Sequence, residues 1–138
     1  MKNQIYRIIA IFGIFLGLAV ASVHAQAPSR VEVNIPFEFS AGKATLKPGV
    51  YSIRRMSGNL LSLRNTEDKS TVVLNAPLTI SSNDPKAVER LVFNKYEDGY
   101  VLSQVWLTAD TGRQLLVKSK GPTYERVELS LRTTAMNR

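Results

Sequence analysis

The residue types that most often perform catalysis or bind metals are scarce in this chain of 138 residues. It contains no cysteine and a single histidine, His24, which lies in an N-terminal segment with the pattern of a secretory signal. Nucleophilic catalysis usually requires a base beside the nucleophile, most often histidine, and zinc is held mainly by cysteine and histidine. A mature chain without either residue disfavours both kinds of site, so we expect no metal and no other cofactor.

One nucleophile–base spacing remains, the Ser-x-x-Lys of Ser40 and Lys43 in "SAGK". In penicillin-recognising acyl enzymes this spacing works because the serine opens a helix and the lysine lies on the same face one turn later. Here Ala41-Gly42 predicts a turn between two strands, and the companion motifs of those enzymes are absent. We interpret the match as a coincidence.

Carboxylates could also do chemistry, because an acidic pair can act in general acid–base catalysis or glycoside hydrolysis. Six of the 11 acidic residues lie in predicted turns, where solvent surrounds them: Glu67, Asp68, Asp84, Glu97, Asp98 and Asp110. Glu32 and Glu38 share a predicted strand face but lie six residues apart, or roughly 20 Å at the rise of a strand. The chain is therefore predicted not to be an enzyme, although a carboxylate pair across two strands is left open.

Three aromatic residues cluster on one predicted hairpin: Tyr96, Tyr100 and Trp106. Strand alternation would place Tyr100 and Trp106 on one face together with Leu102 and Gln104. An exposed face of this kind could stack on sugars or other ligands. The favoured alternative is that Tyr100 and Trp106 belong to the core, because large aromatic side chains usually dominate cores.

The basic residues suggest a different kind of surface. The formal net charge is +7, and it becomes +5 once Lys2 and Arg7 leave with the signal. The densest basic pair is Arg54-Arg55, and the other basic residues are dispersed. Dispersed positive charge favours loose attraction to anionic surfaces over a nucleic-acid groove. We therefore expect no nucleic-acid partner, and we take Arg54 and Arg55 as further candidates to face a ligand.

The elements that would position these residues are strands, because the hydrophobic period of the mature region is two. The clearest run extends from Val31 to Phe39, where five apolar side chains share one face: Val31, Val33, Ile35, Phe37 and Phe39. Pro36 lacks an N–H group and predicts a free edge at that point. Ala76-Pro77 predicts a second bend or edge.

Glycine and proline mark the corners between strands. Pro48-Gly49 suits a type II turn with a positive φ at Gly49. "SGN" at 57–59 and the Asp-Gly pair at 98–99 predict two tight hairpins. Short strands separated in this way indicate an all-β fold, a single antiparallel β-sandwich or small barrel of seven to nine strands. The tail 122–138 fits either a strand or a short helix.

The N-terminus predicts export. A basic start, an apolar run from Ile8 to Val20, and small residues at Val23 and Ala25 form a secretory signal. We expect residues 1–25 to form a signal helix that is removed, and residues 26–138 to form one β-domain. The mature protein would be periplasmic or extracellular, without a stable membrane anchor.

The same residues carry a resemblance. The order "IPFEF", "LKPGVY", "RLVFNKY" and "YVLSQVW" resembles a group of small exported β-rich proteins from soil bacteria, which have no characterised activity. The matching positions are Pro36, Phe37, Phe39, Gly42, Leu46, Pro48, Gly49, Tyr51, Leu91, Phe93, Tyr100, Leu102 and Trp106. Two features depart from the pattern, the adjacent proline and glycine of "LKPGVY" and the insertion "KGPT" before the last strand. The resemblance implies a β-fold and export, and it implies no catalytic residue.

The sequence thus predicts an exported, non-catalytic β-domain that binds or assembles at the cell envelope. Its partner would be anionic polysaccharide, lipid headgroups or another protein. The alternatives are a carbohydrate-binding module, a small hydrolase, and a carrier of a small apolar ligand. A carrier would enclose a cavity lined by Phe37, Phe39, Tyr51, Ile53 and Phe93.

Overall fold

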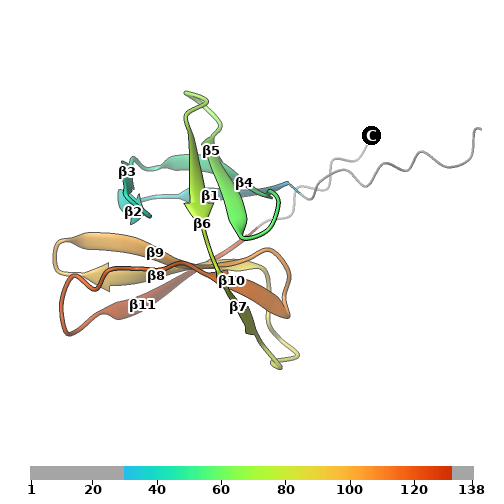
Figure 1. Cartoon of the computed structure of the whole chain (residues 1–138). Coiled ribbons are helices and arrows are strands. Elements are labelled where there is room, and N and C mark those ends of the chain that lie inside the picture. Colours follow the sequence, from blue (N-terminus) through green and yellow to red (C-terminus); the bar gives the residue numbers. More distant parts are fainter. Residues whose placement is uncertain (1–29, 132–138) are drawn as a thin grey trace, which may run out of the picture.

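The computed structural model of the protein describes residues 30–131, and this part of the chain forms eleven strands and no helix (Figure 1). The strands are β1 (Val31–Ile35), β2 (Phe39–Ala41), β3 (Ala44–Leu46), β4 (Gly49–Arg55), β5 (Leu60–Asn65), β6 (Thr71–Asn75), β7 (Leu78–Ser81), β8 (Arg90–Tyr96), β9 (Gly99–Trp106), β10 (Thr111–Gln114) and β11 (Glu125–Ser130). The predicted all-β class is confirmed for these residues. The expected number of seven to nine strands is wrong. The predicted signal helix at 1–25 lies outside the described residues.

The strands form two open sheets, and neither closes into a barrel. The first sheet has four antiparallel strands in the order β1-β4-β5-β6. The second has seven strands, with β11-β8-β9-β10-β7 as its main path and the β2–β3 hairpin beside β9. The pairing of β2 with β9 is parallel, which differs from the purely antiparallel arrangement predicted. Between residues 30 and 131, no helix is long and apolar enough to cross a membrane.

The chain changes sheets three times, each time at a proline, and two of these crossings explain why the strand count was too low. Pro36 interrupts the run that was predicted as one strand, so that β1 lies in the first sheet and β2 in the second. Pro77 similarly separates β6 of the first sheet from β7 of the second. The third crossing, at Pro48, leads from β3 of the second sheet back to β4 of the first. Proline cannot donate a hydrogen bond to a ladder, so all three crossings fall where the ladder must stop.

The core lies between the two sheets and is built around three aromatic side chains. Phe39 of β2 packs edge-to-face against Tyr51 of the first sheet and against Phe93 of the second, with ring centroids 5.5 Å apart in both pairs. All three are at most 2% exposed. The apolar positions of β1 alternate inward as predicted, because Val31, Val33 and Ile35 are buried.

Two of the predicted turns behave differently from each other. Gly58 adopts a positive φ of 61° in the hairpin between β4 and β5, as its position in "SGN" predicted. Gly49 was expected to need a positive φ, and this is wrong, since it begins β4 without one. A Cβ at Gly49 would instead lie 3.2 Å from Nδ2 of the fully buried Asn65. Any larger residue at this position would have to push Asn65 aside by a few tenths of an ångström, so close packing favours glycine here.

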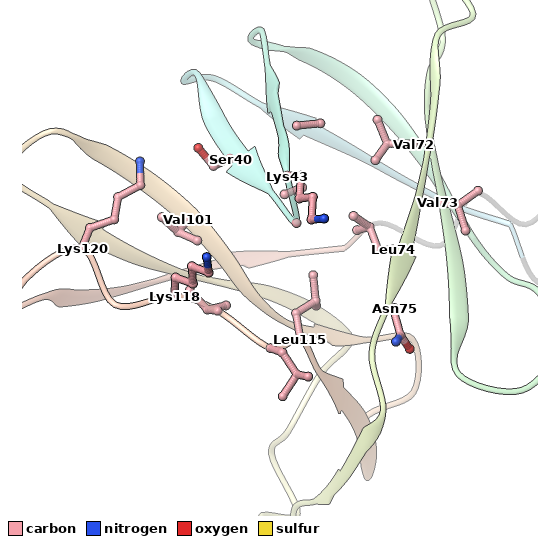
Figure 2. Close-up of a pocket in the computed structure, with 15 residues that line it drawn as sticks. Ser40, Lys43, Val72, Val73, Leu74, Asn75, Val101, Leu115, Lys118 and Lys120 are labelled. Carbon is pink, nitrogen blue, oxygen red and sulfur yellow. The ribbon is translucent and has the colours of Figure 1, made fainter.

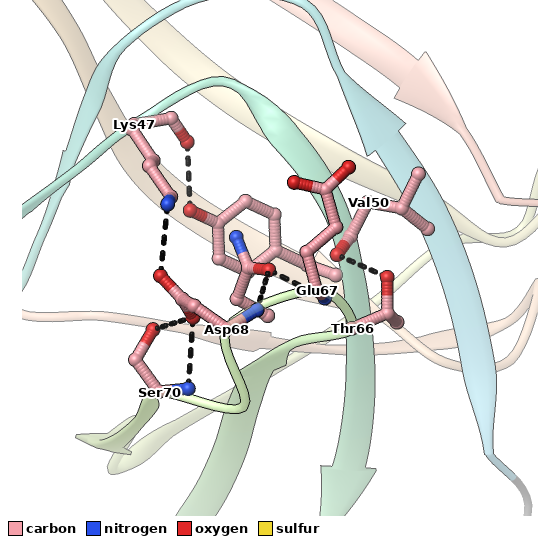
Figure 3. Close-up of polar contacts among 8 residues, drawn as sticks. Lys47, Val50, Thr66, Glu67, Asp68 and Ser70 are labelled. Atoms are coloured by element: carbon pink, nitrogen blue, oxygen red, sulfur yellow. Dashed lines mark hydrogen bonds and ion pairs between the residues drawn. The ribbon is translucent and has the colours of Figure 1, made fainter.

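Asn65 organises the turn between β5 and β6 (Figure 3). Its Oδ1 accepts hydrogen bonds from the backbone N–H groups of Glu67 and Asp68, at 2.8 and 3.3 Å. The carboxylate of Asp68 in turn accepts from the hydroxyl and the N–H of Ser70, and it pairs with the ammonium group of Lys47 at 2.9 Å. These donors lower the pKa of the Asp68 carboxyl well below its usual range, with the Ser70 hydroxyl as the largest cause.

The C-terminal part of the domain is a strand. β11 pairs with β8 in an antiparallel register from Glu125 opposite Lys95 to Ser130 opposite Arg90. The open choice between helix and strand for the tail is therefore decided in favour of a strand at residues 125–130. The residues beyond Leu131 lie outside the described part of the chain.

Candidate functional site

A cleft of about 930 Å³ lies between β6 of the first sheet and the β2–β3 hairpin of the second (Figure 2). Four segments line it: the β2–β3 hairpin at 40–44, β6 at 72–75, Val101 of β9, and the chain after β10 at 115–118 with Lys120. Its size falls at the upper end of the roughly 300–1,000 Å³ that ligand sites usually occupy. The cleft is the first candidate for a binding site.

The floor of the cleft is apolar because several strand residues turn their side chains into it. Figure 2 shows Val72 and Leu74 on the side of β6 that faces the hairpin, and Val73 on the opposite side. Leu74 is buried and Leu115 is 3% exposed. Leu115 is fixed by a hydrogen bond of 2.9 Å from its N–H to the carbonyl oxygen of Ser103.

Leu116, by contrast, is 69% exposed where it lines the cleft. Val73, whose side chain lies on the other side of β6, is 53% exposed and adds no apolar side chain to the floor. Single exposed apolar residues are common on protein surfaces, but Leu116 adds to the apolar floor that Val72, Leu74 and Leu115 already form.

The charged residues of the cleft all have the same sign. Lys43 enters from the β2–β3 turn, and Lys118 and Lys120 enter from the chain that follows β10. No acidic residue lines the cleft among the described residues. Lys120 lies 4.0 Å from Asp98 on the adjacent hairpin, whereas no ion pair within residues 30–131 involves Lys43 or Lys118. The cleft therefore presents an apolar floor beside positive charge.

Ser40 and Lys43 both line this cleft, but they do not form a catalytic pair. They lie on the two sides of a β-hairpin turn in which Gly42 has a φ of 59°. Figure 2 shows the hydroxyl of Ser40 and the ammonium group of Lys43 pointing in different directions. The helical geometry in which a lysine activates a serine three residues earlier is absent from this hairpin.

The three predicted aromatic candidates lie in separate surroundings. Tyr100 is half-buried and stacks on Phe37 with ring centroids 3.8 Å apart. Tyr96 is 6% exposed and packs against Tyr124. Trp106 is 4% exposed, and the guanidinium group of Arg90 lies over its ring, with Cζ 4.0 Å from the ring centroid. No two of the three predicted residues form an aromatic contact in the described part of the chain.

A β-bulge explains why the expected common face does not form. β8 and β9 pair Val92 with Gln104 but Phe93 with Leu102, which leaves Ser103 as an extra residue in β9. A bulge shifts the alternation of side chains by one position. Leu102 and Val105 consequently belong to the main core cluster, whereas Trp106 is buried outside it.

The two predicted arginine candidates lie at the end of β4. Arg54 and Arg55 are exposed, and they pair with Ser62 and Leu61 of β5. Neither lines the cleft. The five predicted residues are thus not brought together in one place.

The cleft itself was missed by sequence reasoning. The internal cavity considered for a carrier is filled, since Phe39, Tyr51, Ile53 and Phe93 pack closely in the core with Phe37 against them. The two signals that could have indicated the cleft are the adjacent leucines of "QLLVKSK" and the lysines that follow them.

Within residues 30–131, no three histidine, cysteine, aspartate or glutamate side chains gather in a way that could hold a metal ion. Comparisons of the chain with protein families, curated proteins and solved structures found no match. The resemblance to small exported proteins of soil bacteria therefore stays a prediction, and the site has to be interpreted from its geometry.

Proposed function

We propose that this protein is an exported, non-catalytic binding domain of the cell envelope, with two sheets packed as a β-sandwich and the cleft as its ligand site. The observation that carries the proposal is the apolar floor of the cleft beside Lys43, Lys118 and Lys120, with no acidic residue in the lining. Such a site fits a ligand that presents apolar groups and negative charge together. The arginines at the end of β4 have a secondary role or none.

The burial of the aromatic residues supports this proposal over a carbohydrate-binding module. A sugar platform requires exposed rings, and both Tyr96 and Trp106 are largely covered. A hydrolase has less support, because Ser40 and Lys43 lack the helical arrangement that activates a serine. Binding in the cleft requires neither exposed aromatic rings nor an activated serine.

The proposal is tested with the fluorescent dye anilinonaphthalene sulfonate, which combines an apolar ring system with a negative charge. The folded protein should bind the dye, and Lys43→Glu/Lys118→Glu should weaken binding roughly three- to tenfold, because each exposed charge contributes about 0.2–1 kcal/mol. Leu116→Ser should weaken it as well, through the loss of exposed apolar surface in the cleft.

The matched control is Arg54→Glu/Arg55→Glu, which reverses two exposed charges outside the cleft. This variant should bind the dye as the original chain does. Circular dichroism and the fluorescence of the single tryptophan verify that every variant is folded. Equal weakening by both double reversals would contradict a ligand site in the cleft and would leave only diffuse attraction to positive charge.

A further inference from the structure

The free backbone edge of β6 indicates which class of ligand the cleft binds. β6 is the last strand of the four-stranded sheet, so it pairs with β5 on one side and with no described strand on the other. At its two ends, the N–H of Ala76 donates to Asn59 at 2.9 Å, and the carbonyl oxygen of Ser70 accepts from Asn65 at 2.9 Å. In an antiparallel ladder, alternate residues make these bonds. Residues 70, 72, 74 and 76 therefore direct their backbone groups toward β5.

Thr71, Val73 and Asn75 must then direct their N–H and C=O groups away from β5, toward the free edge. No hydrogen bond within residues 30–131 uses the N–H groups of these three residues. A row of unpaired backbone groups of this kind is a template for pairing with another strand.

Natural proteins usually protect such an edge with charged residues, proline or a bulge. β6 reads "TVVLN" and has no charge, no proline and a regular register with β5. β11, one of the edge strands of the other sheet, instead carries Glu125, Arg126 and Glu128. The edge of β6 is therefore open to pairing in a way that β11 is not.

The unprotected edge and the cleft coincide. Four consecutive residues of β6, 72–75, line the cleft, and no residue of β5 does, so the cleft lies on the side of β6 that is away from β5. We propose that an extended, acidic segment of a partner protein fills the cleft and adds to the edge of β6 as a further strand. This inference rests on the proposed function, since it names the class of ligand that the cleft binds.

The site can recognise both the main chain and the side chains of such a segment. The outward N–H and C=O groups of Thr71, Val73 and Asn75 bond the main chain of the segment, and this gives affinity without regard to sequence. Alternate apolar side chains of the segment enter the apolar cleft, and acidic side chains face Lys43 and Lys118. A lipid acyl chain cannot use the backbone groups. A second copy of this chain would bring the same lysines and a positive net charge.

The test uses a synthetic ten-residue peptide of alternating valine and glutamate, with both ends blocked, measured by displacement of the dye from the full mature chain. Two further peptides carry N-methyl groups, one on every valine and the other on every glutamate. In a strand, all valines direct their N–H groups to one edge and all glutamates to the other. One N-methylated peptide should lose at least about tenfold in affinity, while the other stays within about threefold of the parent.

Two measurements on the protein locate the added strand. Bound peptide should slow hydrogen exchange at the amides of Thr71, Val73 and Asn75, which face outward, with little further change at Val72 and Leu74. Val73→Pro removes one outward N–H without removing a bond to β5, and it should lower the affinity for the peptide by about tenfold or more. Val73→Thr keeps the N–H, so it should leave this affinity unchanged.

The outcomes separate this inference from the proposed function. If the dye binds in the cleft but the two N-methylated peptides bind equally, the cleft is a ligand site and strand addition is wrong. Displacement of the dye by anionic vesicles and not by peptide would also overturn strand addition, in favour of a lipid ligand. Peptide-independent dimerisation that Val73→Pro abolishes would assign the edge to a second copy and would likewise overturn it. If the dye does not bind the cleft at all, both proposals fall.

Discussion

At the scale of single residues, Trp106 shows how closely this small domain is packed. Its Nε1 donates a hydrogen bond to Oε1 of Gln104 at 3.0 Å, and the guanidinium group of Arg90 covers its ring. The third contact is Gly112 of β10, where an added Cβ would lie only 2.5 to 2.8 Å from atoms of the indole. The tryptophan therefore occupies space that only a glycine leaves free.

We predict that Gly112→Val lowers the free energy of unfolding by about 1–3 kcal/mol, the usual cost of overpacking. The indole must move or β10 must separate from β9, so the fluorescence of the single tryptophan should also change. Gly121→Val is the matched control, because a Cβ there meets nothing within 4 Å. Chemical denaturation of both variants, followed by tryptophan fluorescence, measures the difference. An unchanged midpoint for Gly112→Val would mean that the indole is not held against β10.

At the scale of elements, the turn between β5 and β6 depends on an ionised carboxylate. The Ser70 hydroxyl and the Lys47 ammonium group lower the pKa of Asp68, so the folded state favours the charged form. A carboxyl with a lowered folded pKa stabilises the protein above its ordinary pKa of about 3.9, and this contribution is lost as the pH falls further. The same pair raises the pKa of Lys47, which keeps the lysine charged throughout this range.

Asp68→Asn should therefore lower the melting temperature at neutral pH, and the difference from the original chain should shrink below about pH 4. The effect should be modest, because both side chains of the ion pair are well exposed to solvent. Thermal unfolding at neutral pH and at acid pH, followed by circular dichroism, measures it. Asp110→Asn, at an exposed residue whose side chain makes no hydrogen bond or ion pair within residues 30–131, controls for the loss of one negative charge. A difference that persists unchanged in acid would show that hydrogen bonds of the neutral side chain, and not its charge, support the turn.

The sequence was informative about elements whose partners are close along the chain. The turns at Gly58 and Asp98-Gly99 join β4 to β5 and β8 to β9 as predicted, since a hairpin is specified by a few consecutive residues. The bulge at Ser103 and the parallel pairing of β2 with β9 depend on contacts between distant segments, which a period of two does not reveal. A shift of one residue exchanges the two faces of a strand, and this explains why Trp106 and Leu102 do not share a face.

The cleft could not be predicted for the same reason. Its lining comes from four segments between Ser40 and Lys120, and they meet only because the chain crosses between the sheets at Pro36, Pro48 and Pro77. Sequence patterns singled out Arg54 and Arg55, which do not line the cleft, and indicated neither its lysines nor the apolar floor beside them. Site prediction was therefore limited by tertiary contacts, whereas the fold class was already apparent in local patterns.

At the scale of the whole molecule, Phe39 joins the two sheets. It belongs to the second sheet through its pairing with β9, and its ring packs on Tyr51 of the first sheet and Phe93 of the second. We predict that Phe39→Ala lowers the free energy of unfolding by about 3–5 kcal/mol, as for other buried aromatic residues. Phe37→Ala is the comparison, and it should cost less because Phe37 is only half-buried.

The position of Phe39 between the sheets also predicts that Phe39→Ala lowers the stability of both sheets equally. If the two sheets unfold as one cooperative unit, as the core shared between them leads us to expect, truncating this ring weakens both sheets together. Native-state hydrogen exchange should then show the most protected amides of β4 and of β8 losing the same free energy of opening. A loss confined to β8 and β9, with the exchange of β4 unchanged, would mean that the two sheets unfold separately and that the contact between Phe39 and Tyr51 does not couple them.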